Sequence, residues 1–467
     1  MSAIRTFSII IFFLFSLPIF SEAKRLEEIL DILATEHPEA KSLAGVSHAH
    51  KSHSDASGIL PDPKIGFAYR NYPTRNGYSL NGNRALDTPT MTGMEFSVSQ
   101  EFPFPGKLGT EKRISKIMEN EATLGYLVGV NRMLGDFFIR LNRFQRIEKK
   151  KQINGRILDL LNAQKSIAEG YYSAGTVPLT GALKASIAKT DALEKEAEYG
   201  TNLKDLTSQL EYYKVLDRVS LADLFQINLD SFLEESLQRL NGLANSGVPA
   251  VEETPDYKIL LAEEKRLKEQ TKLTKYSLAP QTEVFFSYMK RKSQTFSADT
   301  GPLNYSLMDT TEYRGDLFSF GINMRVPVWS ALKWNSITGE TEHLAEVGKD
   351  AVDKTRAQMV SEINRGIEVI RGTSNQIQII EKKLIPEMEK AARASASLYA
   401  PGKANIQDTL LAQTEVLNAK IRLEDLRERK NETILNMLKL LSLIYQDQKV
   451  PKHEKHQPEV TLGRGRE

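Results

Sequence analysis

The sequence predicts a mostly α-helical protein that carries a few amphipathic β-strands and is built from two similar halves. Long tracts rich in Ala, Leu, Glu, Lys and Gln, with apolar residues three and four apart, indicate helices. Four short segments alternate apolar and polar residues strictly, which indicates strands with one apolar and one polar face. These features recur in the same order, so one duplicated architecture accounts for the 467 residues.

Residues 1–23 are predicted to be a signal peptide. Arg5 precedes the apolar run 9–20, and Ser21-Glu22-Ala23 offers small residues where a signal peptidase cleaves. We therefore expect the mature, exported chain to begin at Lys24. The apolar run is too short to span a bilayer as a helix, and no other stretch is long and apolar enough, so we expect no transmembrane helix.

Residues 24–245 are expected to form a first repeat: a helix, two strands within 58–109 and a long helical hairpin. The apolar faces of the two strands comprise Ile65, Phe67 and Tyr69, and then Phe96, Val98, Phe102 and Phe104 together with Gln100. The loop between them, 71–93, is rich in Gly, Asn, Pro and Thr and is predicted to be a long turn. The helix that follows, from about 110 to about 172, would be roughly 90 Å long, more than a small globular core can accommodate.

Residues 246–446 are expected to form the second repeat: a helix, two strands within 280–330 and another long helical hairpin. The apolar faces comprise Val284, Phe286 and Tyr288, and then Phe318, Phe320, Ile322, Met324, Val326 and Val328. The loop 292–315 is again predicted to be a long turn. In 363–384 a heptad seam runs through Ile363, Ile367, Ile370, Ile377 and Leu384, with Ser374 and Glu381 as interruptions. The charged tail 447–467 is predicted to be disordered.

The duplication is supported by matching landmarks in the two halves. HPEAK at 37–41 corresponds to TPDYK at 254–258, Phe96 and Pro103 to Phe320 and Pro327, and YYSAG at 171–175 to LYAPG at 398–402. The separation between corresponding landmarks only increases along the chain, as loop insertions after a duplication require.

Composition excludes several classes of function. Lys and Arg number 62 against 60 Asp and Glu, so the net charge of +2 gives no reason to expect a nucleic-acid partner. Cysteine is absent, which excludes disulfides, thiolate metal sites and a lipid-modified cysteine. The sequence contains no HExxH or GxSxG motif and no phosphate-binding loop. We therefore expect no enzyme, no catalytic residues and no cofactor.

Two arrangements fit amphipathic strands of this length. A soluble sheet packed on helices shows the same alternation as a membrane β-barrel, whose outside contacts lipid and whose inside contacts water. The signal peptide and the long polar loops favour the barrel. Four strands cannot close a barrel, so several protomers must share one: two copies give 8 strands with a filled lumen, and three give 12 with room for a passage.

The strand-to-helix junctions contain proline and glycine residues where a strand would have to end and the chain would have to turn into a helix. Pro103 and Pro105 would end the second strand, Gly106 would let the chain turn into the long helix, and Pro327 occupies the matching junction of the second half.

The sequence resembles the TolC-type outer-membrane factors of tripartite efflux systems. The resemblance covers about residues 26 to 446 and rests on LEEILDILATEHPEAK, LPDPKIGFAYRNYP, FSVSQEFPFPGKLG, the duplicated Tyr-x-x-Gly turns and QDTLLAQTEVLNAKIRLEDL. The combination of LPDP, NYP and QEFPFPGK is most similar to the branch that serves heavy-metal resistance pumps.

The resemblance implies a homotrimer with a 12-stranded β-barrel in the outer membrane and a long antiparallel α-helical barrel in the periplasm. It implies a passive exit duct, in the metal branch for heavy-metal cations, that works with a periplasmic adaptor (membrane fusion) protein and an inner-membrane pump of the resistance-nodulation-division (RND) type. Three alternatives stay open: the same duct for drugs, dyes or type I protein secretion, a trimeric coiled-coil surface scaffold or adhesin, and a periplasmic adaptor.

The resemblance also implies sites. Asp408 matches an aspartate that rings the closed periplasmic aperture, whereas Leu411 stands where the family often has a second aspartate, and Gly181 occupies the corresponding place in the first half. The turns Ala174-Gly175-Thr176 and Pro401-Gly402-Lys403 match hairpin tips that contact the adaptor. Alternatively, Asp408 is an ordinary solvent-exposed aspartate near a helix N-terminus, and the two turns are ordinary helix C-caps.

Three further groups of residues have side-chain chemistry that would suit a site. His48, His50 and His53 with Asp55 have the chemistry of metal ligands, but exposed histidines in a connecting segment are common and we expect no metal site. Met91 and Met94 could offer thioethers near the outer loop, which is a still weaker signal. Trp329 and Tyr69 are expected to belong to an aromatic belt at the membrane interface.

Overall fold

The computed structural model describes residues 26–71, 92–174, 179–215, 218–244, 249–291, 294–296, 310–312, 314–399, 406–446 and 450–451. These residues fall into two units, and each unit draws on both halves of the sequence. Unit 1 comprises Met1–Ala40, Met133–Arg239 and Val369–Asn436; unit 2 comprises Lys41–Arg132, Leu240–Glu368 and Met437–Glu467. The predicted signal peptide and almost all of the predicted tail lie outside the described residues, and the division into two sequence repeats stays a prediction.

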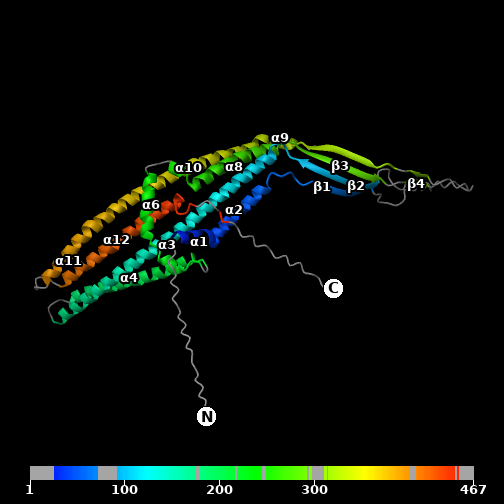
Figure 1. The fold of residues 1–467 in the computed structure, drawn as a ribbon. Helices are drawn as coiled ribbons and strands as arrows, with labels where there is room; N and C mark the ends of the chain where they lie inside the picture. Colours follow the sequence, from blue (N-terminus) through cyan, green and yellow to red (C-terminus); the bar gives the residue numbers. More distant parts are fainter. Residues whose placement is uncertain are drawn as a thin grey trace, which may run out of the picture. The chain divides into compact units, whose positions relative to one another are not determined.

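Unit 2 contains the predicted four-stranded sheet (Figure 1). Its strands are β1 (Lys64–Arg70), β2 (Gly93–Phe102), β3 (Gln281–Arg291) and β6 (Leu317–Arg325), in the spatial order β1-β2-β3-β6. All three pairings are antiparallel. One row of paired residues is Phe67, Phe96, Tyr288 and Phe318, and the next is Gly66, Ser97, Ser287 and Ser319. The predicted alternation of apolar and polar faces is therefore confirmed.

The predicted long turn 292–315 is wrong in part. The short strands β4 (Gln294–Phe296) and β5 (Thr310–Glu312) pair antiparallel and form a second, two-stranded sheet within this segment. The Thr and Phe residues of these strands favour extended backbone, whereas the Gly, Pro and Asn residues between them are typical of turns.

The helical part of unit 2 packs α8 (Pro255–Ser277) against α10 (Trp334–Ile379). Thr254 caps α8 by accepting a hydrogen bond from the Tyr257 N–H, and Pro255 occupies the first turn, where its missing N–H is not needed. A buried cluster of Val251, Tyr257, Val352 and Met359 joins these helices to α7 (Pro249–Glu252). Unit 2 also holds most of α2 (Pro38–Ala56), all of α9 (Val328–Leu332) and the first part of α3 (Lys107–Ser173).

Unit 1 is helical and is organised around the middle of α3. That helix is 67 residues long, which confirms the predicted helix of 110–172. Its fully buried Phe137 and Phe138 contact Tyr213 and Phe232, with ring centroids 5.1 and 4.8 Å apart respectively. The other elements of unit 1 are α1 (Leu26–Glu36), α4 (Leu179–Glu211), α5 (Leu221–Phe225), α6 (Leu229–Ala244), the end of α10, η1 (Ile380–Leu384), α11 (Ile385–Tyr399) and α12 (Ile406–Leu440).

Helix is interrupted at two places where the sequence predicted continuous helical character. After α4 ends at Glu211, an isolated bridge pairs Val215 with Val219 before α5 begins. The second interruption is η1, a π-helical turn in which the Ile385 N–H bonds to the Ile380 carbonyl, five residues back. Pro386 follows directly, and because it lacks an N–H it cannot continue the regular α-helical ladder.

None of the helices in the described part of the chain combines the length and the apolar character that crossing a bilayer requires.

Candidate functional site

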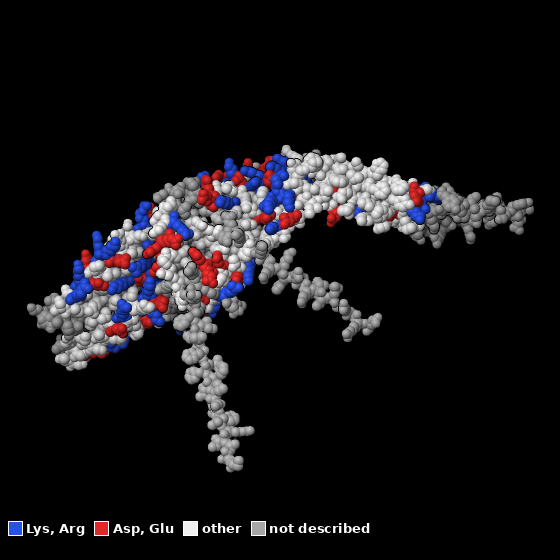
Figure 2. Space-filling model, in the orientation of Figure 1, with Lys and Arg blue, Asp and Glu red and all other residues white. Residues whose placement is uncertain are grey.

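The apolar face of the sheet is uncovered in a single chain. Phe320 is 89% exposed, Phe67 is 81% exposed and Phe318 is 70% exposed, although phenylalanine is normally among the residues that folding buries. Figure 2 shows few charged side chains over this part of unit 2, whereas Lys, Arg, Asp and Glu gather over its helices. A contiguous exposed apolar surface of this kind marks an interaction site with a partner or a membrane.

The opposite face of the sheet is polar and built from small side chains. Gly66, Ser97, Ser287 and Ser319 form one of its rows. Towards the helical end of the sheet, the Lys64 ammonium lies 3.9 Å from carboxylate oxygens of both Glu101 and Glu283. Small and charged residues on one face of a sheet would suit a water-filled lumen.

Phe285 is an aromatic residue on the polar face, and Gly321 accommodates it. A Cβ atom added at Gly321 would lie 2.7 Å from the Phe285 ring, closer than atoms can pack. The glycine in β6 therefore leaves room for an aromatic ring that projects from the neighbouring β3.

The two outer strands present open edges. Within the described sheet, β1 pairs with β2 alone and β6 with β3 alone. Because every pairing in the order β1-β2-β3-β6 is antiparallel, β1 and β6 run in opposite directions. Another copy of the chain could therefore add its β1 to this β6 as a regular antiparallel pair, and repetition of this step would produce a barrel.

The junction from β2 into α3 has the geometry expected from its prolines and glycine. β2 ends at Phe102, directly before Pro103, and Gly106 has φ +93°, which only glycine adopts without strain. Phe104 stacks on Tyr276 with ring centroids 5.9 Å apart, and the Tyr276 ring lies 3.2 Å from the position of a Cβ at Gly106. In the matching junction, Pro327 precedes α9 without making a side-chain cap.

The two hairpins of unit 1 bring small side chains together near their ends. Ala168 of α3 and Ala185 of α4 form a buried contact, and the Ser395 and Thr409 hydroxyls lie 3.0 Å apart between α11 and α12. Of the predicted tip residues, Ala174 follows the end of α3 and donates its N–H to the Gly170 carbonyl. Gly175, Thr176, Pro401, Gly402 and Lys403 lie outside the described residues.

Asp408 and Leu411 lie together at the start of α12. Asp408 is exposed in the first turn, where a carboxylate is stabilised by the helix dipole. Leu411 is 54% exposed and three residues later, so the two side chains occupy the same side of the helix. Gly181 falls in the first turn of α4. An exposed acid beside an exposed leucine is compatible with an aperture-lining position, which stays a prediction.

The other residues considered as sites have simpler environments. His48 contacts the Pro451 carbonyl at 2.7 Å through Nε2. No group of three or more His, Cys, Asp or Glu side chains within the described ranges is arranged to hold a metal. Met94 lies exposed on the apolar face of the sheet, and Met91 lies outside the described residues. Trp329 and Tyr69 are exposed, as an interfacial belt requires.

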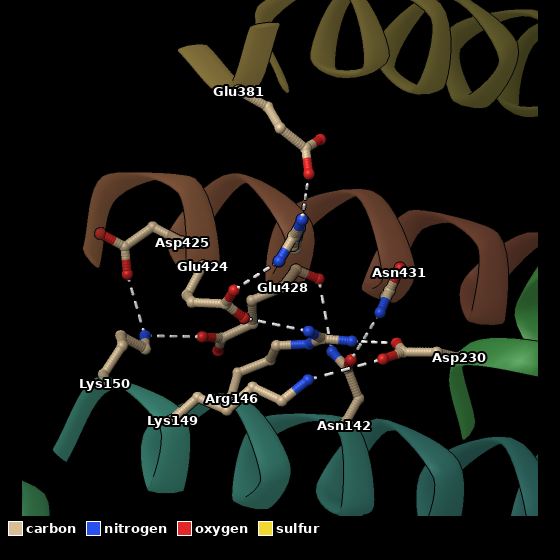
Figure 3. Close-up of polar contacts among 11 residues, drawn as sticks. Asn142, Arg146, Lys149, Lys150, Asp230, Glu381, Glu424, Asp425, Glu428 and Asn431 are labelled. Atoms are coloured by element: carbon tan, nitrogen blue, oxygen red, sulfur yellow. Dashed lines mark hydrogen bonds and ion pairs between the residues drawn. The ribbon is translucent and has the colours of Figure 1, made fainter. Parts of the chain in front are cut away.

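An ionic cluster in unit 1, built around the buried side chains of Arg146 and Glu424, was not expected from the sequence (Figure 3). Arg146 of α3 contacts Glu424 of α12 at 3.0 Å and also bonds to Asp230 of α6. One turn later, Lys150 contacts Asp425 at 2.9 Å and Glu428 at 2.8 Å. One feature of the sequence is consistent with this cluster: two cations in α3, Arg146 and Lys150, lie four residues apart, and so do two acids in α12, Glu424 and Glu428. Nothing in the sequence, however, shows that two helices so far apart along the chain pack together.

The cluster also contacts η1 through Arg427, and it lies beside a cavity. Arg427 donates to Glu424 and, at 2.8 Å, to Glu381 within the π-helical turn. A cavity of about 390 Å³ lies beside Arg146, Asp230, Glu381 and Arg427. Burial alone would lower the pKa of Lys150, but its contacts with Glu428 and Asp425 outweigh burial and raise this pKa above its ordinary value. Lys150 therefore stays charged at neutral pH, and the contacts of the cluster connect α3, α6, α12 and η1.

The fold is similar to those of solved outer-membrane channels. The outer membrane protein VceC from Vibrio cholerae matches with a TM-score of 0.66 and 12% identity, over 89% of this chain and 95% of that chain. The CmeC outer membrane channel from Campylobacter jejuni matches with a TM-score of 0.64 and 13% identity, over 89% and 85% respectively. The open state of the MtrE outer membrane channel from Neisseria gonorrhoeae matches with a TM-score of 0.61 and 11% identity, over 90% and 89%.

No family model and no curated protein matches this sequence. At 10–13% identity the likeness establishes the fold. The chain shares the fold of these solved outer-membrane channels, with long helices and a four-stranded antiparallel sheet.

Proposed function

We propose that this chain is a subunit of an outer-membrane channel of the TolC type and serves as the passive exit duct of a tripartite efflux system. The observation that carries the proposal is the four-stranded sheet, which exposes an apolar face and ends in two open edges. In lipid, backbone groups at an open edge have no partner, so such a sheet is stable only when closed. The similarity of the fold to solved outer-membrane channels also supports the proposal that this chain is a channel subunit.

Three copies account best for closure. The strands β2, β3 and β6 have 10, 11 and 9 residues, the length of a tilted transmembrane strand. Three protomers supply 12 strands and a lumen wide enough for solutes, whereas two supply 8 and a lumen that side chains fill. The polar faces of the sheets would then line the lumen, and the apolar faces would contact outer-membrane lipid.

The helices of the three copies would continue the duct into the periplasm. The hairpin tips at Ala174-Gly175-Thr176 and Pro401-Gly402-Lys403 would contact a periplasmic adaptor, which delivers substrate from an inner-membrane pump of the RND type. Asp408 and Leu411 would line the closed periplasmic aperture. A single carboxylate with a neighbouring leucine would give a narrow gate that favours cations less strongly than a double ring of acids. No step of this function requires covalent chemistry or a cofactor.

We propose heavy-metal cations as the cargo, on the strength of the sequence motifs LPDP, NYP and QEFPFPGK. Deleting the gene should sensitise cells to zinc, cobalt, cadmium, copper or silver, and the protein should fractionate with outer membranes as a trimer. Sensitivity limited to dyes and detergents would instead support a duct for drugs. A soluble monomer would contradict the duct itself.

A further inference from the structure

The cavity of about 390 Å³ in unit 1 has both a buried and an exposed part. We call the buried part of its lining the floor, where Arg146, Leu233 and Ile434 are each at most 3% exposed. The exposed part is the rim, where the side chains of Asp230 and Glu381 are about half exposed. Small-molecule sites typically have volumes of about 300–1,000 Å³, an apolar lining and a few polar groups that orient the ligand. Three observations indicate which kind of molecule this cavity suits.

The first observation is a buried hydrogen-bond donor on the floor that has no acceptor. Figure 3 shows Nη1 of Arg146 bonded to Glu424 and Nη2 bonded to Asp230. The third nitrogen of this guanidinium group, Nε, is buried and has no hydrogen-bond partner in the described part of the chain. A buried N–H without an acceptor costs free energy, so such groups nearly always bond to protein or to a bound molecule. The cavity has room for that molecule, because a single water occupies only about 10–15 Å³ of such volume.

The second observation is the balance of charge around the cavity. The four lining charges of the ionic cluster neutralise one another in two pairs, Arg146 with Asp230 and Arg427 with Glu381.

Two further lining charges remain. Glu234 is exposed on α6 and Lys430 is half-buried on α12, and neither makes an ion pair within the described ranges. A ligand that carries only a carboxylate would be repelled by Glu234, and one that carries only an ammonium group would be repelled by Lys430. A zwitterion offers an opposite charge to each of them.

The third observation is an aliphatic wall. Four branched side chains contribute to the lining: Leu233 and Leu237 of α6, Ile377 of α10 and Ile434 of α12. Leu233 and Leu237 lie one helical turn apart, so they occupy the same side of α6. A saturated carbon chain of a few atoms would replace water against this wall, which is favourable.

We propose that the cavity binds a zwitterionic aliphatic molecule with the chemistry of a free α-amino acid such as leucine. Its carboxylate accepts hydrogen bonds from Nε of Arg146 and from Lys430, its ammonium group lies against Glu234, and its side chain contacts the aliphatic wall. All of these residues belong to unit 1, and the inference does not depend on the proposed channel function. A bound molecule would contact α3, α6, α10 and α12 together, so it should stabilise the packing of these helices.

Calorimetric titration of the full-length protein in detergent tests the proposal with four probes. L-leucine should bind more tightly than 4-methylpentanoate, which lacks the ammonium group, than 3-methylbutylamine, which lacks the carboxylate, and than glycine, which lacks the aliphatic body. Each missing contact should weaken binding about tenfold. L-leucine should also raise the midpoint of thermal unfolding. If L-leucine does not bind, or binds no better than the two singly charged analogues, the cavity holds water alone or another class of ligand and the proposal is wrong.

Two substitutions then assign the charges. Glu234→Gln should remove the advantage of leucine over 4-methylpentanoate, and Lys430→Gln should remove its advantage over 3-methylbutylamine. Neither substitution breaks an ion pair of the described chain, so both variants should fold normally. Glu235→Gln is the matched control, because Glu235 is an exposed acid of the same helix that does not line the cavity. Leucine binding that is unchanged in both test variants would place the amino acid elsewhere and overturn the assignment of this cavity.

Discussion

Arg146 donates a hydrogen bond from Nη1 to Oε2 of Glu424 at 3.0 Å, and the two side chains are only 3% and 8% exposed. This pair joins the middle of α3 to α12 across 278 residues of sequence. Asp230 of α6 bonds to the same guanidinium group. Three helices of unit 1 therefore depend on one buried cation for their packing.

Arg146→Met should destabilise the protein by roughly 1–3 kcal/mol, because it removes one of the two arginines that bond to the buried Glu424 carboxylate, the other being Arg427. The urea midpoint of the helical circular-dichroism signal would measure the loss. Arg239→Ala is the matched control: its ion pair with Glu235 is 59% and 64% exposed and should contribute less than about 1 kcal/mol. Equal effects of the two substitutions would show that the buried pair has no special role.

Glu269 of α8 should make stability depend on pH in the acidic range. Burial alone would raise the pKa of Glu269, but hydrogen bonds from Lys272 and Arg113 outweigh burial and hold this pKa below its ordinary value. A carboxylate with a lowered folded-state pKa stabilises the fold above its unfolded-state pKa of roughly 4.3, and this stabilisation is lost as the pH falls through the folded-state value.

Glu269→Gln should therefore lower the free energy of unfolding at neutral pH, and its difference from the wild type should shrink as the pH falls below about 4. Chemical denaturation across this range would measure the difference, with Glu253→Gln, an exposed acid, as the control. A difference in the free energy of unfolding that does not change with pH would contradict the hydrogen bonds of Glu269 with Lys272 and Arg113.

Gly106→Ala should cost about 1–2 kcal/mol, because φ +93° strains any residue with a Cβ and because the Tyr276 ring lies 3.2 Å from where that atom would sit. Thermal unfolding would measure the loss. Gly109→Ala, three residues along in α3, meets only the end of the Arg113 side chain at 3.7 Å and should be neutral or stabilising. If both substitutions behaved alike, the turn at Gly106 would not constrain the junction.

Asp408→Asn should raise single-channel conductance in planar bilayers severalfold and reduce the preference for cations, since a ring of three carboxylates at the aperture would be neutralised. Glu387→Gln removes an exposed carboxylate from α11 and serves as the control for loss of charge alone. Conductance and ion selectivity that match those of the control would remove Asp408 from the aperture.

The strands and their faces could be predicted because period-2 alternation is strict over four segments. Even their ends follow from residue chemistry: β2 stops at Phe102 because Pro103 has no N–H to donate to a ladder. The sheet order and the antiparallel pairing of β2 with β3 join segments from different halves of the chain, and local patterns carry no information about such pairing.

Two of the features that the sequence did not predict escaped for different reasons. The π-helical turn at Ile380–Leu384 follows from Pro386, but a proline in a helical tract equally allows a kink or a break. The Arg146 cluster depends on side chains that become neighbours only when α3, α6 and α12 pack together. The charged residues of each helix have the pattern of a solvent-exposed face, so the sequence did not indicate that Arg146 and Glu424 would be buried.

The central claim is that β1 of one copy pairs with β6 of the next, and cysteine cross-linking tests it most directly because the natural chain has no cysteine. Ala68→Cys and Ser319→Cys place one thiol on each open edge, both on the polar face. In native membranes a short bifunctional maleimide should yield covalent dimers and trimers and no larger species, whereas each single variant should yield none. A chain that stays monomeric, links β1 to β6 within itself, or forms ladders longer than three copies would contradict the shared barrel.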